Sequence, residues 1–133
     1  MSRYYSTYKI LIIIPSNINY NERALLHIRH PMSAHIKQQI ENKLKEVMDP
    51  ELNISIVDLG LIYDVIVEEK KVKVRMTLTT IGCPLVGTIE HTIKEKLKEI
   101  EIDPNDVTIE LTFDPPWSMD RISEEGKAML GID

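Results

Sequence analysis

Cys83 is the only cysteine among 133 residues, and it lies where an alternating strand pattern gives way to a helical one. A thiol at a helix start faces unpaired backbone N–H groups and the positive end of the helix dipole, which favour the thiolate. The thiolate is the nucleophilic and metal-binding form of cysteine. Pro84 suits the first helical residue, and Gly82 leaves room beside the sulfur. Thiol chemistry is therefore possible at Cys83, although a small buried apolar side chain explains the residue equally well.

Three further polar side chains could carry chemistry of their own or beside this thiol's segment. Thr80 carries a hydroxyl group just ahead of Cys83, where it could donate a hydrogen bond to the sulfur or to a ligand. Asp49 and Glu51 flank Pro50, which stiffens the segment and fixes the two carboxylates relative to each other. Such carboxylates could bind a metal ion or accept a proton. The alternative is that they are the solvated acids of a turn that ends a helix.

A rigid segment later in the chain, Asp114-Pro115-Pro116-Trp117, is a candidate for partner binding. Large aromatic side chains anchor protein interfaces well, so Trp117 could dock a partner or cover a pocket. It could equally belong to the core. We predict a partner-binding role for Trp117 and Asp114, and the sequence offers no residue for which we predict catalysis.

The elements that must position these residues are three helices and three strands. In chain order we predict a helix at 33–48, strands at 62–67 and 72–79, a helix at 84–100, a strand at 107–113 and a helix at 123–131. The first two strands should form an antiparallel hairpin, and the third should lie parallel to the second through a right-handed crossover. The prediction is a compact single α/β domain, helix-hairpin-helix-strand-helix, with a small mixed three-stranded sheet.

Residues 1–32 show no comparable period, so we expect an amino-terminal extension there and the domain at 33–133. Met32 is a hypothetical alternative start.

The 21 acidic and 16 basic residues give a net charge of −5, which argues against nucleic-acid binding. The apolar run 10–14 is too short to cross a membrane, which takes about 20 residues. A single cysteine forms no internal disulfide, so a cytoplasmic location is expected.

Four motifs in order resemble the SufT/PaaD-like family of iron-sulfur assembly proteins. They are Asp49-Pro50-Glu51-Leu52, the segment 56–63, the segment 77–85 around Gly82-Cys83-Pro84, and Asp114-Pro115-Pro116-Trp117 with Asp120-Arg121. The resemblance covers roughly residues 33–133. The sequence departs from it at Ile81 and Met119, where relatives commonly have proline, and at Gly126, where alanine is common and glycine could loosen the last helix. The given sequence ends at Asp133 with no counterpart of the cysteine-rich extension of the PaaD branch, so we expect the general assembly role.

This resemblance implies a non-enzymatic assembly factor whose signature residue is Cys83, with Asp49, Glu51 and Thr80 lining a shared pocket. One thiolate cannot supply the four ligands that an iron-sulfur cluster usually takes. Cluster binding at Cys83 would therefore be transient and would need a homodimer, an assembly partner, an apo-client protein or a small thiol. Two alternatives stay open: a thiol peroxidase, whose threonine-to-cysteine spacing the segment 80–83 also resembles, and an adaptor that needs no thiol.

Overall fold

The computed structural model describes residues 31–132. The chain divides into two units, Met1–His35 and Ile36–Asp133, and the second contains all the strands. Nearly all of the predicted extension at 1–32 lies outside the described residues, and the hypothetical start at Met32 lies at their edge. No helix in the described part of the chain is long and apolar enough to cross a membrane.

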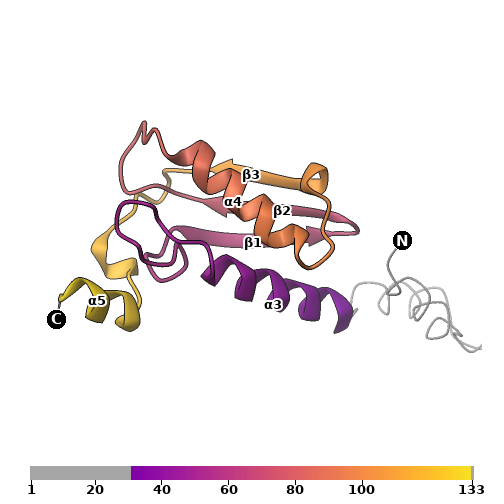
Figure 1. Ribbon diagram of the computed structural model, residues 1–133, viewed down its shortest axis with the longest axis horizontal. Helices are drawn as coiled ribbons and strands as arrows, with labels where there is room; N and C mark the ends of the chain where they lie inside the picture. The colour runs from indigo at the N-terminus through magenta and orange to yellow at the C-terminus, as the bar shows by residue number, and fades with distance from the viewer. Residues whose placement is uncertain (1–30, 133) are drawn as a thin grey trace, which may run out of the picture. The chain divides into compact units, whose positions relative to one another are not determined.

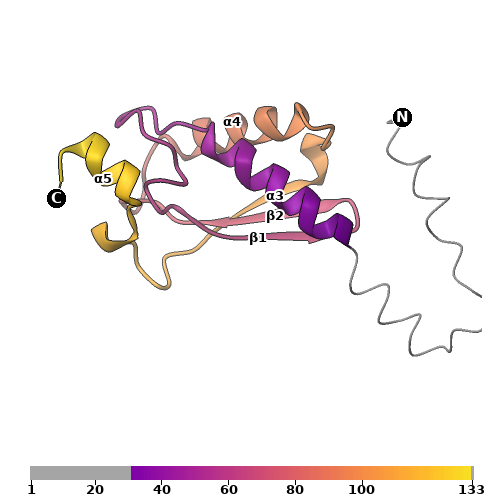
Figure 2. The ribbon, with the colours of Figure 1, turned by 90° about the horizontal axis from the view of Figure 1, so that it is seen from below.

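Besides two single-turn 3-10 helices at Pro104–Asp106 and Met119–Arg121, the described residues form three α-helices and a three-stranded sheet (Figure 1). In chain order they are α3 (Pro31–Lys45), β1 (Ile62–Glu68), β2 (Lys71–Met76), α4 (Val86–Lys98), β3 (Val107–Leu111) and α5 (Glu124–Leu130). The strand order is β1-β2-β3, with β1 antiparallel to β2 and β2 parallel to β3. Figure 2 shows α3 and α4 on the same face of this sheet. The predicted mixed α/β fold is confirmed.

The core lies between the two helices and the covered face of the sheet. Helix α3 contributes Ile40 and Leu44, and α4 contributes Ile93 and Leu97, all of them fully buried. The buried side chains of β2 alternate along the strand, as the period-two pattern predicted. On the opposite face, Lys73 and Arg75 alternate with them and pair with Glu110 of β3 at 3.4 and 3.1 Å. The sheet therefore has one apolar and one charged face.

Helix α3 ends three residues before the predicted Met48 and begins at Pro31 rather than at Ser33. After Lys45 the chain leaves the helix because Met48 forms an isolated antiparallel bridge with Ser55. The backbone N–H of Asp49 also donates to the carbonyl of Ile54 at 2.8 Å. This small bridge turns the chain back on itself, and helical spacing alone carried no sign of it.

Both parallel strands end two or three residues earlier than predicted, β2 at Met76 and β3 at Leu111. Thr77 still donates its backbone N–H to the carbonyl of Leu61, but it has left the strand. Its side chain is fully buried, and its hydroxyl has no hydrogen-bond partner among the described residues. The segment that leads to Cys83 is therefore longer and less regular than the alternating pattern indicated.

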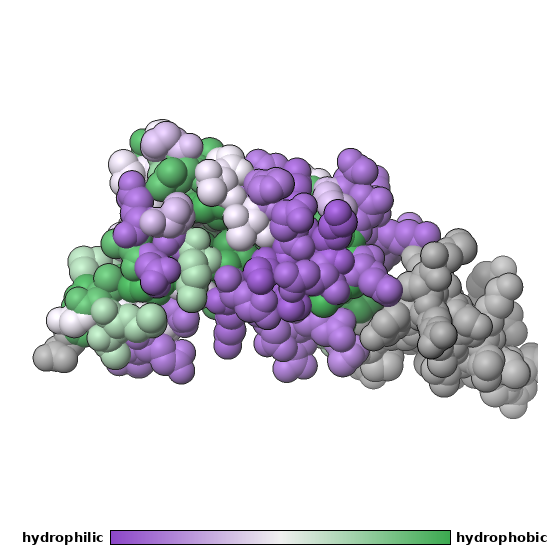
Figure 3. Space-filling view, in the orientation of Figure 1, coloured by the Kyte–Doolittle hydropathy of each residue, from purple (hydrophilic) through white to green (hydrophobic). Residues whose placement is uncertain are grey.

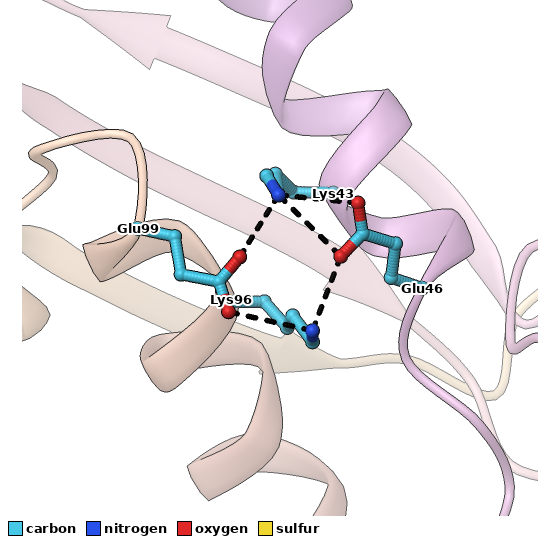
Figure 4. Close-up of polar contacts among 4 residues, drawn as sticks. All are labelled: Lys43, Glu46, Lys96 and Glu99. Atoms are coloured by element: carbon cyan, nitrogen blue, oxygen red, sulfur yellow. Dashed lines mark hydrogen bonds and ion pairs between the residues drawn. The ribbon is translucent and has the colours of Figure 1, made fainter.

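Four charged side chains join α3 to α4 in a closed ring, which Figure 4 shows. Lys43 pairs with Glu46 at 3.1 Å and with Glu99 at 2.8 Å. Lys96 pairs with Glu46 at 3.1 Å and with Glu99 at 3.4 Å. Hydrogen bonds from the two lysines lower the pKa of both carboxyl groups, and the same bonds raise the pKa of both amines.

This ring should make stability depend on pH and salt. The lowered pKa of Glu46 and Glu99 means that their contribution is present above the ordinary value of 4.5 and is lost as the pH falls through the folded-state pKa. The lysine contribution is present below 10.5 and is lost at higher pH. We expect the Tm advantage of the wild type over Glu46→Gln/Glu99→Gln to shrink below pH 4.5 and in high salt. An advantage unchanged by acid and salt would show that the ring contributes nothing through charge.

Candidate functional site

All the predicted site residues belong to segments at one end of the sheet. The register pairs Ile62 with Met76 and Met76 with Leu111, so β1 begins where β2 and β3 end. The connecting segments 46–61, 77–85 and 112–123 therefore meet at this end, and α5 follows the last of them (Figure 1). We call these three segments with α5 the loop end of the domain.

Cys83 lies in the turn between β2 and α4, half-buried and packed against the core. The predicted helix start at Pro84 is wrong, because α4 begins at Val86 and Leu85 is its N-cap. Gly82 adopts a left-handed φ of +80°, so the chain turns here before helical geometry starts. The Val86 N–H lies 3.5 Å from the carbonyl of Cys83, so the chain is still turning at the thiol and the cysteine precedes the helix.

The surroundings of Cys83 are open on the side of its preceding residues. Thr80 and Gly82 are exposed, and Ile81 is 80% exposed. A Cβ built on Gly82 would have no heavy atom within 4 Å. The thiol thus lies between the core, which it contacts, and a stretch of backbone that another molecule can approach. The contact with the core agrees with the structural explanation of this residue, and thiol chemistry at Cys83 stays a prediction.

Asp49 organises the loop that follows α3. Its carboxylate oxygen Oδ1 accepts hydrogen bonds from the backbone N–H of Glu51 at 2.8 Å and of Leu52 at 3.0 Å. Asp49 is therefore an Asx-turn residue, which is the structural alternative that the sequence offered. The side chain of Glu51 is exposed. Both residues lie at the loop end with Cys83 and Thr80, and a pocket shared by the four stays a prediction.

Trp117 attaches the segment 112–123 to the rest of the domain through a hydrogen bond and through packing. Its indole Nε1–H donates to the carbonyl of Leu59 at 2.7 Å, and its ring packs against the core. Asp114 is exposed on the same loop, and its backbone N–H lies 3.3 Å from the hydroxyl of Thr112. Trp117 thus makes a structural contact, and a partner-binding role for it and for Asp114 is untested.

Trp117→Phe should destabilise the protein by about 1–3 kcal/mol, because it removes the donor and leaves the carbonyl of buried Leu59 unsatisfied. The measurement is the free energy of unfolding in urea. Phe113→Leu is a suitable control because Phe113 is 38% exposed on the same loop, and its change should stay within about 0.5 kcal/mol. Equal effects of the two substitutions would show that the indole hydrogen bond contributes little.

Asp58 joins the segment before β1 to the last helix. Its side chain accepts from the hydroxyl of Ser123 at 2.8 Å, and its carbonyl accepts from the Ser123 backbone N–H at 2.8 Å. Ser123 in turn caps α5 by accepting from the N–H of Gly126. Gly126 is buried, and a Cβ there would lie 2.9 Å from the Asp58 carbonyl oxygen. Glycine therefore permits close packing of α5 on this loop and is not simply a weak helix former.

Gly60 and Tyr63 complete the attachment of the last loop. Gly60 has a φ of +70°, and a Cβ there would meet the backbone carbonyl and the Cβ of Arg121. The Arg121 guanidinium lies 4.3 Å above the ring centre of Tyr63, whose hydroxyl donates to the Pro115 carbonyl at 2.7 Å. Of these residues only Gly60 carries a local signal, because a glycine within a short apolar segment suggests a bend. Contacts between residues about 60 positions apart have no local signature.

The described residues contain no cluster of three or more His, Cys, Asp or Glu side chains that could hold a metal ion. What the fold assembles at the loop end is one half-buried thiol beside exposed backbone, together with exposed carboxylates and hydroxyls. A site of this class suits a contact that is shared with another molecule.

The model of the iron-sulfur cluster assembly protein family matches residues 37–111, which run from α3 through β3. Two relatives support this match. The Fe-S protein maturation auxiliary factor YitW of Bacillus subtilis is 38% identical over 102 residues, which are 76% of this chain and 99% of that protein. The factor SufT of Staphylococcus aureus is 42% identical over 87 residues, 65% of this chain and 98% of that protein. The chain belongs to the iron-sulfur cluster assembly protein family.

Solved structures of similar sequence have the same fold. A domain of unknown function from Bacillus anthracis, 36% identical, superposes with a TM-score of 0.71 over 78% of this chain and 100% of its own. A conserved hypothetical protein of Thermotoga maritima, 45% identical, gives a TM-score of 0.60 over 72% of this chain and 94% of its own. The SufT-like resemblance recognised from the four motifs is therefore confirmed.

Proposed function

We propose that this protein is a non-enzymatic, cytoplasmic maturation factor for iron-sulfur proteins, which contacts a cluster or an apo-client through Cys83. The proposal is carried by one observation: the single thiol of a chain in this family lies in an open turn at the loop end. Relatives with 38–42% identity are named maturation auxiliary factors, which supports an accessory role. The cluster is cargo in this proposal and not a resident cofactor.

The chemistry of the site supports a passing contact. A cluster usually takes four ligands, and Cys83 is the only cysteine, so the other ligands come from an assembly partner, a client, a small thiol or a second copy of the chain. Thiolate exchange from one donor set to another is the means by which such a cluster moves. In this proposal Thr80, Asp49 and Glu51 surround the exchange with hydroxyl and carboxylate groups.

The test is activation of an apo-protein that needs a [4Fe-4S] cluster, supplied by a loaded scaffold protein under anaerobic conditions. Addition of the wild-type protein should raise the rate at which client activity appears, in proportion to its concentration. An activation rate that is the same with and without the protein, for several clients, would contradict the maturation role.

A further inference from the structure

The exposed apolar side chains of this domain are unevenly distributed. Among residues 34–132, seven large hydrophobic side chains are between 38% and 80% exposed, and all seven lie at the loop end or on the strand residue that leads into it. They are Met48, Leu52, Ile81, Leu111, Phe113, Met119 and Met129. Figure 3 shows hydrophobic residues gathered at this end, whereas the surface over α3 and α4 is hydrophilic.

Single exposed hydrophobic residues are normal on protein surfaces, but their gathering at one end indicates an interaction surface. Three of the seven are methionines, whose flexible thioether side chains adapt to different partner surfaces. Such a surface suits a partner site that must accept more than one sequence. Ile81 is the most exposed of the seven, and it lies only two residues from Cys83.

The loop end is also acidic. Apart from Asp58, which bonds to Ser123, and Glu46, which belongs to the ring between α3 and α4, it carries six carboxylate side chains and two basic ones. The acids are Asp49, Glu51, Asp114, Asp120, Glu124 and Glu125. Of the two basic residues, Arg121 lies over the ring of Tyr63 and Lys127 pairs with Glu124 at 3.2 Å. Apolar anchors beside an excess of carboxylates are complementary to a partner that is apolar and basic.

We propose that the loop end is the docking surface for a protein segment whose apolar side chains are flanked by lysine or arginine. This inference rests on the proposed function and deepens it by giving the chemistry of the assembly partner or client. A segment that covers Ile81 would lie beside the thiol of Cys83, so docking would bring the partner's own ligands to it. A second copy of this chain fits less well, because it would place the same carboxylates against each other.

The probe is a fluorescent synthetic peptide of about 14 residues, with leucine and lysine at helical spacing, and a matched peptide with glutamate in place of lysine. Fluorescence anisotropy with the full-length protein should show binding of the basic peptide and none of the acidic one. Raising NaCl from about 50 to about 500 mM should weaken binding about tenfold. Ile81→Ser should also weaken it about tenfold, because Ile81 is the most exposed anchor.

Matched charge variants separate the loop end from the rest of the surface. Glu51→Gln/Glu125→Gln removes two acids there, and Glu41→Gln/Glu95→Gln removes two exposed acids from α3 and α4. The first pair should weaken binding of the basic peptide severalfold, and the second should leave it unchanged. Equal effects of the two pairs would overturn the proposal. Equal binding of both peptides, or a dimer that Ile81→Ser converts to a monomer, would overturn it too.

The variant Cys83→Ser tests whether peptide binding needs the thiol. Peptide binding by this variant should equal that of the wild type, because the proposed surface does not use the sulfur. Failure of the wild type to bind the basic peptide, together with normal client activation, would reject this docking surface and leave the maturation role intact. Peptide binding without client activation by the wild type would reject the maturation role instead.

Discussion

Gly60→Ala is expected to destabilise the protein by about 3–5 kcal/mol, a large part of the stability of an ordinary domain. Two costs add. Gly60 has a φ of +70°, where a side chain costs about 1–2 kcal/mol. An added Cβ would also lie 2.6 Å from the Cβ of Arg121 and closer still to its carbonyl oxygen, a backbone atom that cannot move alone. The substitution would push the last loop away from the segment 46–61.

The matched control is Gly131→Ala. Gly131 has a φ of +69°, yet an added Cβ there would have no heavy atom within 4 Å. Gly131→Ala should therefore lower the free energy of unfolding only by the conformational cost, about 1–2 kcal/mol, as measured in urea. A loss for Gly60→Ala that matches the control would mean that Arg121 shifts freely and that this packing does not hold the loop end together.

Cys83→Ala is expected to reduce client activation to the rate seen without the protein, because the proposed thiolate contact cannot form. The fold should survive the change, since Cys83 is half-buried and the substitution removes one sulfur atom. The measurement is the rate at which client activity appears from a loaded scaffold, with far-UV circular dichroism and Tm of the variant as the check on folding.

Cys83→Ser is the companion variant, because it nearly keeps the volume of the side chain and replaces the soft sulfur by a hydroxyl oxygen, which is a much poorer ligand for an iron-sulfur cluster. Both variants should lose client activation to the same degree. Full activation by both would contradict a role for the thiol and favour the adaptor function, in which partners bind to this protein without cysteine chemistry.

The helices and strands could be predicted from the sequence because their patterns are local. Val72 and Val74 alternate with Lys73 and Arg75, and the strand that this alternation predicts is present with that pattern of burial. The closing helix was also predicted at its two ends, since Ser123 caps it and Gly131 ends it with a left-handed φ. Residue types with one strong structural preference gave the most accurate boundaries.

The connections could not be predicted to the same degree, because distant residues decide them. Pro84 has the geometry of a first helical residue, but the left-handed turn at Gly82 delays the helix to Val86. The hydrogen bonds of Trp117 with Leu59 and of Ser123 with Asp58 join residues about 60 positions apart, and neither pairing has a local signature in the sequence. The four motifs were still sufficient to indicate the family, because the resemblance depends on residue types and their order and not on the contacts that these residues make.

The most direct test of the central proposal is anaerobic reconstitution of the purified protein with iron, sulfide and a small thiol, followed by a visible absorption spectrum with the small thiol still present. The wild type should show the absorbance of a bound cluster, and Cys83→Ala should not, because Cys83 is the only thiolate that the chain supplies. The same cluster absorbance in both proteins would contradict ligation by this residue.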